Sequence, residues 1–131
     1  TTEIYTLSLH DALPILKQIA TSLKRHLNLE AVQIGGNPDA IVKKAAIVGG
    51  KGLSSAKILD IIAAGCDTFI SGEFTYPEYL SCKSLGLNLI GAGHYKTEKI
   101  GMESLTKILS NYFPRDDFIF IEGADPIQYL L

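Results

Sequence analysis

A histidine and a glutamate spaced four residues apart are the side chains in this sequence best suited to bind a metal ion. His94 and Glu98 occur in the stretch GHYKTE at residues 93–98, which begins three residues after an apolar run that ends at Ile90. Residues four apart on a helix project from one face, so an imidazole nitrogen and a carboxylate oxygen can reach one cation. His94 and Glu98 are therefore a candidate metal-binding pair, although spacing alone does not distinguish this from a structural role. The alternative is that His94 caps the helix and Glu98 is a first-turn acid favoured by the helix dipole.

A second candidate site is the glycine-rich stretch GGKGLSS at residues 49–55. Its backbone amides and the start of the following helix form a candidate anion-binding loop, to which a lysine adds positive charge. The residues expected in this role are Gly50, Lys51, Gly52, Ser54 and Ser55. The spacing matches neither the dinucleotide-binding motif nor the P-loop, which favours a plain tight turn over an anion site.

Glu73, in the stretch SGE at residues 71–73, is the third candidate. A carboxylate at this place can accept a hydrogen bond from a histidine whose other ring nitrogen binds a metal. We therefore consider Glu73 as an outer partner of the metal site. The alternative is a solvated acidic side chain at the start of a helix.

The apolar pattern predicts helices that alternate with strands. The predicted helices are residues 16–27, 55–64, 77–85 and 98–112, and the predicted strands are residues 31–34, 45–48, 68–70, 87–90 and 118–121. Such alternation predicts an α/β fold with a largely parallel sheet and helices on both faces. In open sheets of this class, ligands bind beyond the carboxyl ends of the strands. The three candidate stretches all follow predicted strands, so we expect them at one edge of the sheet.

The composition of the chain excludes some classes of binding partner. The chain has 131 residues, of which 47% are hydrophobic. It contains 12 Lys and Arg residues and 14 Asp and Glu residues. Without a basic excess, binding of nucleic acid through bulk charge is not expected. The apolar runs are much shorter than the roughly 18 residues of a membrane span, so no membrane association is expected. Cys66 and Cys82 form no metal-binding or redox pair, which favours two reduced thiols in a cytoplasmic protein.

The first fifteen residues have the sequence of a translated oligonucleotide. In one reading frame, a common short-read sequencing adapter encodes residues 1–15 at all fifteen positions. We therefore expect residues 1–15 to be a non-native segment that packs loosely, and residues 16–131 to be the native part. His10 and Asp11 could otherwise be a metal-ligand or acid–base pair. On this interpretation we do not expect them to have a function.

Four stretches together resemble a known family. They are residues 46–50 (AIVGG), 69–73 (FISGE), 85–90 (LGLNLI) and, most specifically, 93–98 (GHYKTE). They resemble the C-terminal half of the Nif-three-like dinuclear-metal-centre proteins, also called type 2 GTP cyclohydrolase I homologues. The resemblance implies that His94 and Glu98 are ligands of two divalent metal ions, which would be iron, zinc or manganese. The family's remaining ligands, an adjacent histidine pair and an aspartate, belong to an N-terminal half, so residues 16–131 are expected to be a truncated, C-terminal part.

The resemblance implies a function for the longer protein and leaves alternatives open. One is a metal-dependent hydrolase of the cyclohydrolase type, which opens the imidazole ring of GTP, a nucleotide substrate. The other is a non-catalytic protein that binds or delivers metal or acts as a regulatory partner, built as a homohexamer. A third alternative is a phosphate-binding α/β domain that uses the loop at residues 49–55. On the resemblance, the present chain alone is expected to be inactive.

Overall fold

The computed structural model describes residues 3–5 and 13–130. The helices and strands, in chain order, are β1 (Glu3–Tyr5), α1 (Leu16–His26), β2 (Gln33–Gly35), β3 (Ala45–Ile47), α2 (Ser55–Ala63), β4 (Thr68–Ser71), α3 (Tyr76–Leu85), β5 (Asn88–Gly91) and α4 (His94–Tyr112). None of the described helices is both long enough and apolar enough to span a bilayer.

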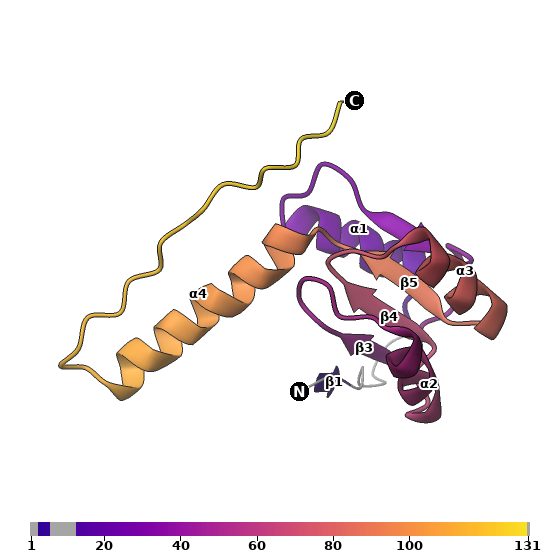
Figure 1. The fold of residues 1–131 in the computed structure, drawn as a ribbon, viewed down its shortest axis with the longest axis horizontal. Coiled ribbons are helices and arrows are strands. Elements are labelled where there is room, and N and C mark those ends of the chain that lie inside the picture. Colours follow the sequence, from indigo (N-terminus) through magenta and orange to yellow (C-terminus); the bar gives the residue numbers. More distant parts are fainter. Residues whose placement is uncertain (1–2, 6–12, 131) are drawn as a thin grey trace.

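The described strands form one mixed sheet in the order β1-β3-β4-β5-β2 (Figure 1). The three central strands β3, β4 and β5 are parallel, as the alternation of helices and strands predicts. Both edge strands are antiparallel to their neighbours: β1 pairs with β3, and β2 pairs with β5. The α/β class is therefore confirmed, and the expectation of a largely parallel sheet is refined to a parallel centre with antiparallel edges.

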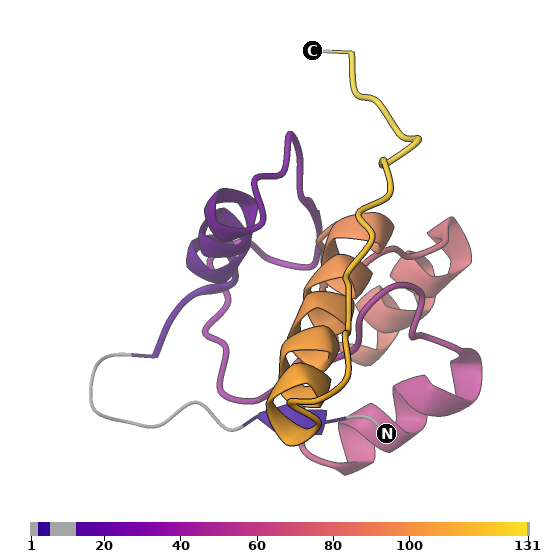
Figure 2. The same cartoon turned by 90° about the vertical axis from the view of Figure 1, so that its left-hand side faces the viewer.

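Helices cover both faces of the sheet because successive strand residues point to opposite sides. In β4, Phe69 packs with the buried residues of α2 and α3, whereas its neighbour Ile70 packs with Leu16 and Ala20 of α1. The same division separates Ala45 from Ala46 and Leu89 from Ile90. Figure 2 shows α1 on one side of the molecule and α2 and α3 on the other.

Helices α2 and α3 have the capping residues that are typical of helix ends. Ser54 precedes α2, and its hydroxyl oxygen accepts a hydrogen bond from the Lys57 amide at 3.5 Å. Before α3, the Thr75 amide donates to Glu78 Oε2 at 2.6 Å, which closes a capping box. The helix ends at Gly86, whose φ of +73° is a left-handed conformation that favours glycine.

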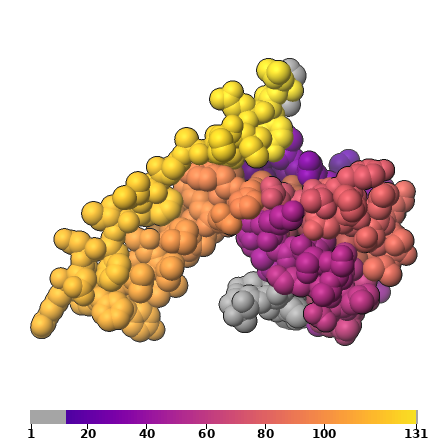
Figure 3. Space-filling model, in the orientation of Figure 1, coloured from indigo at the N-terminus to yellow at the C-terminus, as the bar shows by residue number. Residues whose placement is uncertain are grey.

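The long helix α4 and residues 113–130 form an arm that projects from the sheet (Figures 1 and 3). The helix begins at His94, four residues before the predicted start, and none of its residues is buried. Residues 113–130 run back beside α4 without regular secondary structure.

The prediction of a strand at residues 118–121 is wrong. Phe118 and Phe120 are half-buried and line a hollow together with side chains of α4. Ile119 and Ile121 are 80% and 86% exposed. The segment has the composition of a strand, but it lies along a helix and is not paired with any of the described strands, and pairing is what makes a strand.

The predicted non-native segment is described only in part. Residues 1–2 and 6–12, which include His10 and Asp11, lie outside the described residues. Residues 3–5 form β1, and the Pro14 carbonyl accepts a hydrogen bond from the Val42 amide at 2.9 Å. Residues 3–5 are thus paired through their backbone at the edge of the sheet, whereas the loose packing and the non-native origin of residues 1–15 stay predictions.

Candidate metal centre

The loops that follow the three central strands meet at the carboxyl edge of the sheet. The Gly72 amide, after β4, donates to the Gly50 carbonyl oxygen, after β3, at 2.7 Å. The Gly93 amide, after β5, donates to the Gly72 carbonyl oxygen at 2.8 Å. These bonds bring the three candidate stretches together, and α4 begins in this cluster with His94.

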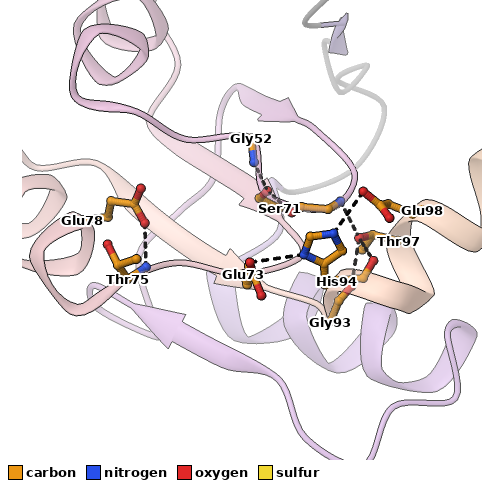
Figure 4. Close-up of polar contacts among 10 residues, drawn as sticks. Gly52, Ser71, Glu73, Thr75, Glu78, Gly93, His94, Thr97 and Glu98 are labelled. Carbon is orange, nitrogen blue, oxygen red and sulfur yellow. Dashed lines mark hydrogen bonds and ion pairs between the residues drawn. The ribbon is translucent and has the colours of Figure 1, made fainter. Parts of the chain in front are cut away.

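His94 lies between two carboxylates, one on each ring nitrogen (Figure 4). Its Nδ1 is 3.2 Å from Glu73 Oε1, and its Nε2 is 3.1 Å from Glu98 Oε1. When Nδ1 carries the proton and donates it to Glu73, the Nε2 lone pair points toward Glu98. A carboxylate on one ring nitrogen, with the second nitrogen able to bind a cation when it is unprotonated, is the arrangement typical of metal-binding histidines.

Charge around the ring raises the pKa of His94 above its ordinary value. The largest cause of this pKa shift is the hydrogen bond to Glu73, and the negative charges of Glu98 and Glu73 act in the same direction, whereas partial burial opposes them. The side chains are open to solvent, with exposed fractions of 38% for His94, 45% for Glu73 and 56% for Glu98. A metal ion that binds this ring would therefore compete with a proton that the ring holds more tightly than an ordinary histidine does.

The candidate anion-binding loop lies against the same centre, and the amides of Gly50 and Gly52 have partners within the protein. The Gly50 amide donates to Thr97 Oγ1 at 2.9 Å, and the Gly52 amide donates to Ser71 Oγ at 3.2 Å. Ser54 caps α2, while the side chains of Lys51 and Ser55 are exposed. These bonds are those of a structured turn, and anion binding by this loop stays a prediction.

Ser71 and Thr97 hold the loop at Gly50 in place beside the candidate centre, and the sequence did not identify either residue as a candidate. Ser71 is fully buried, and its Oγ donates to the Gly50 carbonyl oxygen at 2.8 Å (Figure 4 shows its contact with Gly52). Thr97 lies between His94 and Glu98 on α4 and accepts the Gly50 amide hydrogen bond. Ser71 lies in the stretch SGE and Thr97 in the stretch GHYKTE. Their positions beside Glu73, His94 and Glu98 in the sequence are the signal from which a supporting role could have been predicted.

The centre has few metal-ligating groups. Among residues 13–130, no group of three His, Cys, Asp or Glu side chains converges on one point. Glu73 and Glu98 contact opposite nitrogens of the same ring, so only Glu98 shares a position with Nε2. His26 is not brought here; it lies at the end of α1, where its Nδ1 is 2.8 Å from the Ser22 carbonyl oxygen.

The chain is similar to known sequences over most of its length. A family model described as Duf34/NIF3 (NGG1p interacting factor 3) matches residues 6–126. Relatives from Staphylococcus aureus (strain Mu50) and Bacillus subtilis (strain 168), each named GTP cyclohydrolase 1 type 2 homolog, are 31% and 33% identical over 120 residues, or 88% of this chain. The chain spans about a third of these relatives, 32% and 31% of their respective lengths.

The fold is also similar to a solved structure. A crystal structure of a Bacillus cereus protein related to NIF3 superposes with a TM-score of 0.81 at 24% identity. The superposition covers 98% of this chain and 36% of that one. The two proteins therefore share the fold over nearly all of the present chain.

Proposed function

The chain belongs to the Duf34/NIF3 family, and we propose that it supplies His94 and Glu98 as ligands to a dinuclear metal site of a longer protein. The observation that carries this proposal is the pair of contacts of the His94 ring. Glu73 orients the ring through Nδ1, and Nε2 faces the Glu98 carboxylate at 3.1 Å.

The spacing of these two atoms fits a shared metal ion. Ligand atoms about 2.1 Å from one zinc-like cation lie roughly 3.0 to 3.4 Å apart for octahedral to tetrahedral angles. The Nε2 to Oε1 distance of 3.1 Å falls in this range. A set of one imidazole and one carboxylate suits iron, zinc or manganese.

The reaction that we propose for the longer protein is a hydrolysis of the GTP cyclohydrolase type. Its support is the name shared by the relatives at 31% and 33% identity. Two divalent ions, when bound, would supply Lewis acidity and an activated water. In this chain, Glu73 would fix the orientation of the His94 ring, and Glu98 would add negative charge at Nε2.

A second candidate function is metal binding or delivery without catalysis, or regulation through a bound partner. It is favoured by the openness of the centre, because the side chains of His94, Glu73 and Glu98 are all more than a third exposed. Release of formate from GTP by the longer protein would favour the hydrolase. Bound metal without turnover would favour the second function.

The metal proposal is tested by titrating the 131-residue chain with Mn²⁺ or Zn²⁺. We expect weak binding, because a metal site usually has about three protein ligands and this chain contributes two. Replacing either ligand, in His94→Ala or Glu98→Gln, should abolish that binding. The matched controls are His26→Ala, on α1, and Glu103→Gln, which lies on α4 and pairs with Lys99. Binding that survives His94→Ala would contradict the proposal.

We also propose that the family assembly is a homo-oligomer, a hexamer by resemblance, that works in the cytoplasm. Support for self-association comes from the arm formed by α4 and residues 113–130, which carries exposed apolar side chains such as Ile108, Ile119 and Ile121. Support for a reducing compartment comes from Cys66 and Cys82, which are both free thiols and buried.

A further inference from the structure

The hydroxyl of Thr97 joins α4 to the loop after β3. Thr97 Oγ1 accepts a hydrogen bond from the Gly50 amide at 2.9 Å. It also lies 2.8 Å from the Gly93 carbonyl oxygen and 3.0 Å from the His94 carbonyl oxygen, to which it can donate. A hydroxyl has one proton and two lone pairs, so Thr97 can donate within its helix and accept from the loop at the same time.

The other side of Gly50 is fixed by the end of β4. The Gly50 carbonyl oxygen accepts hydrogen bonds from Ser71 Oγ at 2.8 Å and from the Gly72 amide at 2.7 Å. Both Gly50 and Ser71 are buried. The loop therefore cannot move away from α4 or β4 without leaving buried polar groups without partners, which costs free energy.

The loop held in this way contacts the candidate ligand Glu98. A Cβ atom added to Gly50 would lie only 2.2 Å from Glu98 Oε1, so the glycine backbone and the carboxylate are already adjacent. Gly50 also has a φ of +64°, a conformation that side chains disfavour. The Glu98 side chain is 56% exposed, so this loop and the His94 ring are the neighbours that restrict where its carboxylate can lie.

We propose that Thr97 is a positioning residue of the metal centre. Its hydroxyl holds the Gly50 loop against Glu98 and so keeps the carboxylate at the distance from His94 Nε2 that a shared metal ion requires. This inference rests on the proposed metal-binding function. Loss of an outer partner of a metal ligand weakens metal binding about ten- to a hundredfold, and we expect a change of about tenfold here because Thr97 acts through the loop.

Two variants isolate the hydroxyl. Thr97→Ser keeps the oxygen and removes the methyl group, whereas Thr97→Ala removes both, so the difference between them reports the hydroxyl alone. Thr106 provides a matched control on the same helix, because its Oγ1 donates to the Met102 carbonyl oxygen at 2.9 Å in the same helical pattern. The pair Thr106→Ser and Thr106→Ala measures the general effect of removing a threonine hydroxyl from α4.

The first readout, hydrogen exchange of the Gly50 amide, needs no metal. Thr97→Ala should accelerate this exchange at least tenfold, while Thr97→Ser and both Thr106 variants should leave it close to that of the unchanged chain. The second readout is the affinity for Co²⁺, followed through its visible absorption spectrum. Thr97→Ala should weaken Co²⁺ binding about tenfold and alter the spectrum, and Thr97→Ser should restore both.

The inference is overturned if the Gly50 amide exchanges equally slowly in Thr97→Ala and Thr97→Ser. It is also overturned if Co²⁺ binds both variants equally, because the hydroxyl then does not position Glu98. Co²⁺ binding by the unchanged chain that does not depend on His94 would instead contradict the proposed function. Gly50 exchange would still report in that case whether Thr97 holds the loop.

Discussion

At the scale of single residues, the proposed metal site implies that a proton and a metal ion compete for His94. The hydrogen bond to Glu73 and the charge of Glu98 raise the pKa of the ring above that of the unfolded chain, about 6.5. The stabilisation from protonated His94 is therefore fully present below that value and is lost as pH rises through the folded-state pKa. Metal ligation needs the neutral ring, so we expect metal binding to change in the opposite direction and to strengthen as pH rises.

This competition predicts the effect of Glu73→Gln. Removing the carboxylate charge should lower the pKa of His94 toward its ordinary value and extend metal binding to lower pH. An NMR titration of the His94 ring measures the shift. Glu78→Gln is the control, because Glu78 closes the capping box of α3 through the Thr75 amide. An unchanged His94 pKa in Glu73→Gln would show that Glu73 does not set the proton affinity of the ring.

The candidate site could be found from the sequence because its residues are close along the chain or follow neighbouring strands. Spacing alone predicts that His94 and Glu98 share a helix face, and the sheet rule places Glu73 at the same edge. The hydrogen bonds by which Thr97 and Ser71 hold the loop at Gly50 could not be predicted from spacing along the chain. They join these residues to Gly50, which is 47 residues from Thr97 and 21 from Ser71.

At the scale of secondary structure, elements that are buried were easier to predict than elements at the edge. The central strands are apolar runs covered by helices on both faces, so their sequences identify them directly. Whether an edge strand runs parallel or antiparallel depends on long-range pairing, which composition does not encode. The segment at residues 118–121 is strand-like in composition, but Phe118 and Phe120 lie against α4 instead.

Strand β1 provides a test of the segment expected to be non-native. We predict that a chain beginning at residue 13 folds cooperatively and loses no more than about 3 kcal/mol of unfolding free energy, the net value of a few edge hydrogen bonds. The expectation follows because both described core clusters consist of residues between Leu16 and Ile90. Urea denaturation of the two chains measures the difference. Failure of the shorter chain to fold would show that residues 1–12 are an integral part of the domain.

At the scale of the whole molecule, the fold divides into a packed sheet domain and a projecting arm (Figure 3). Within the arm, α4 and residues 113–130 contact each other near the candidate metal centre, where Lys99 pairs with Glu122 and the Tyr95 hydroxyl donates to the Gly123 carbonyl. Farther along, Leu105, Ile108 and Tyr112 of α4 are 45% to 78% exposed. A large exposed apolar surface of this kind is typical of an interface.

We predict that the chain self-associates through this arm. Replacing Ile119 and Ile121 together by Asp should shift the chain toward the monomer, because burying two charged side chains in an apolar interface costs far more than burying isoleucine. The matched control is Leu59→Asp, on α2, where an apolar side chain is 61% exposed outside the arm. Sedimentation velocity over a hundredfold range of concentration measures the change. A chain that is monomeric throughout, or one that dissociates equally in the Leu59 variant, would show that the arm is not the surface through which copies of this chain meet.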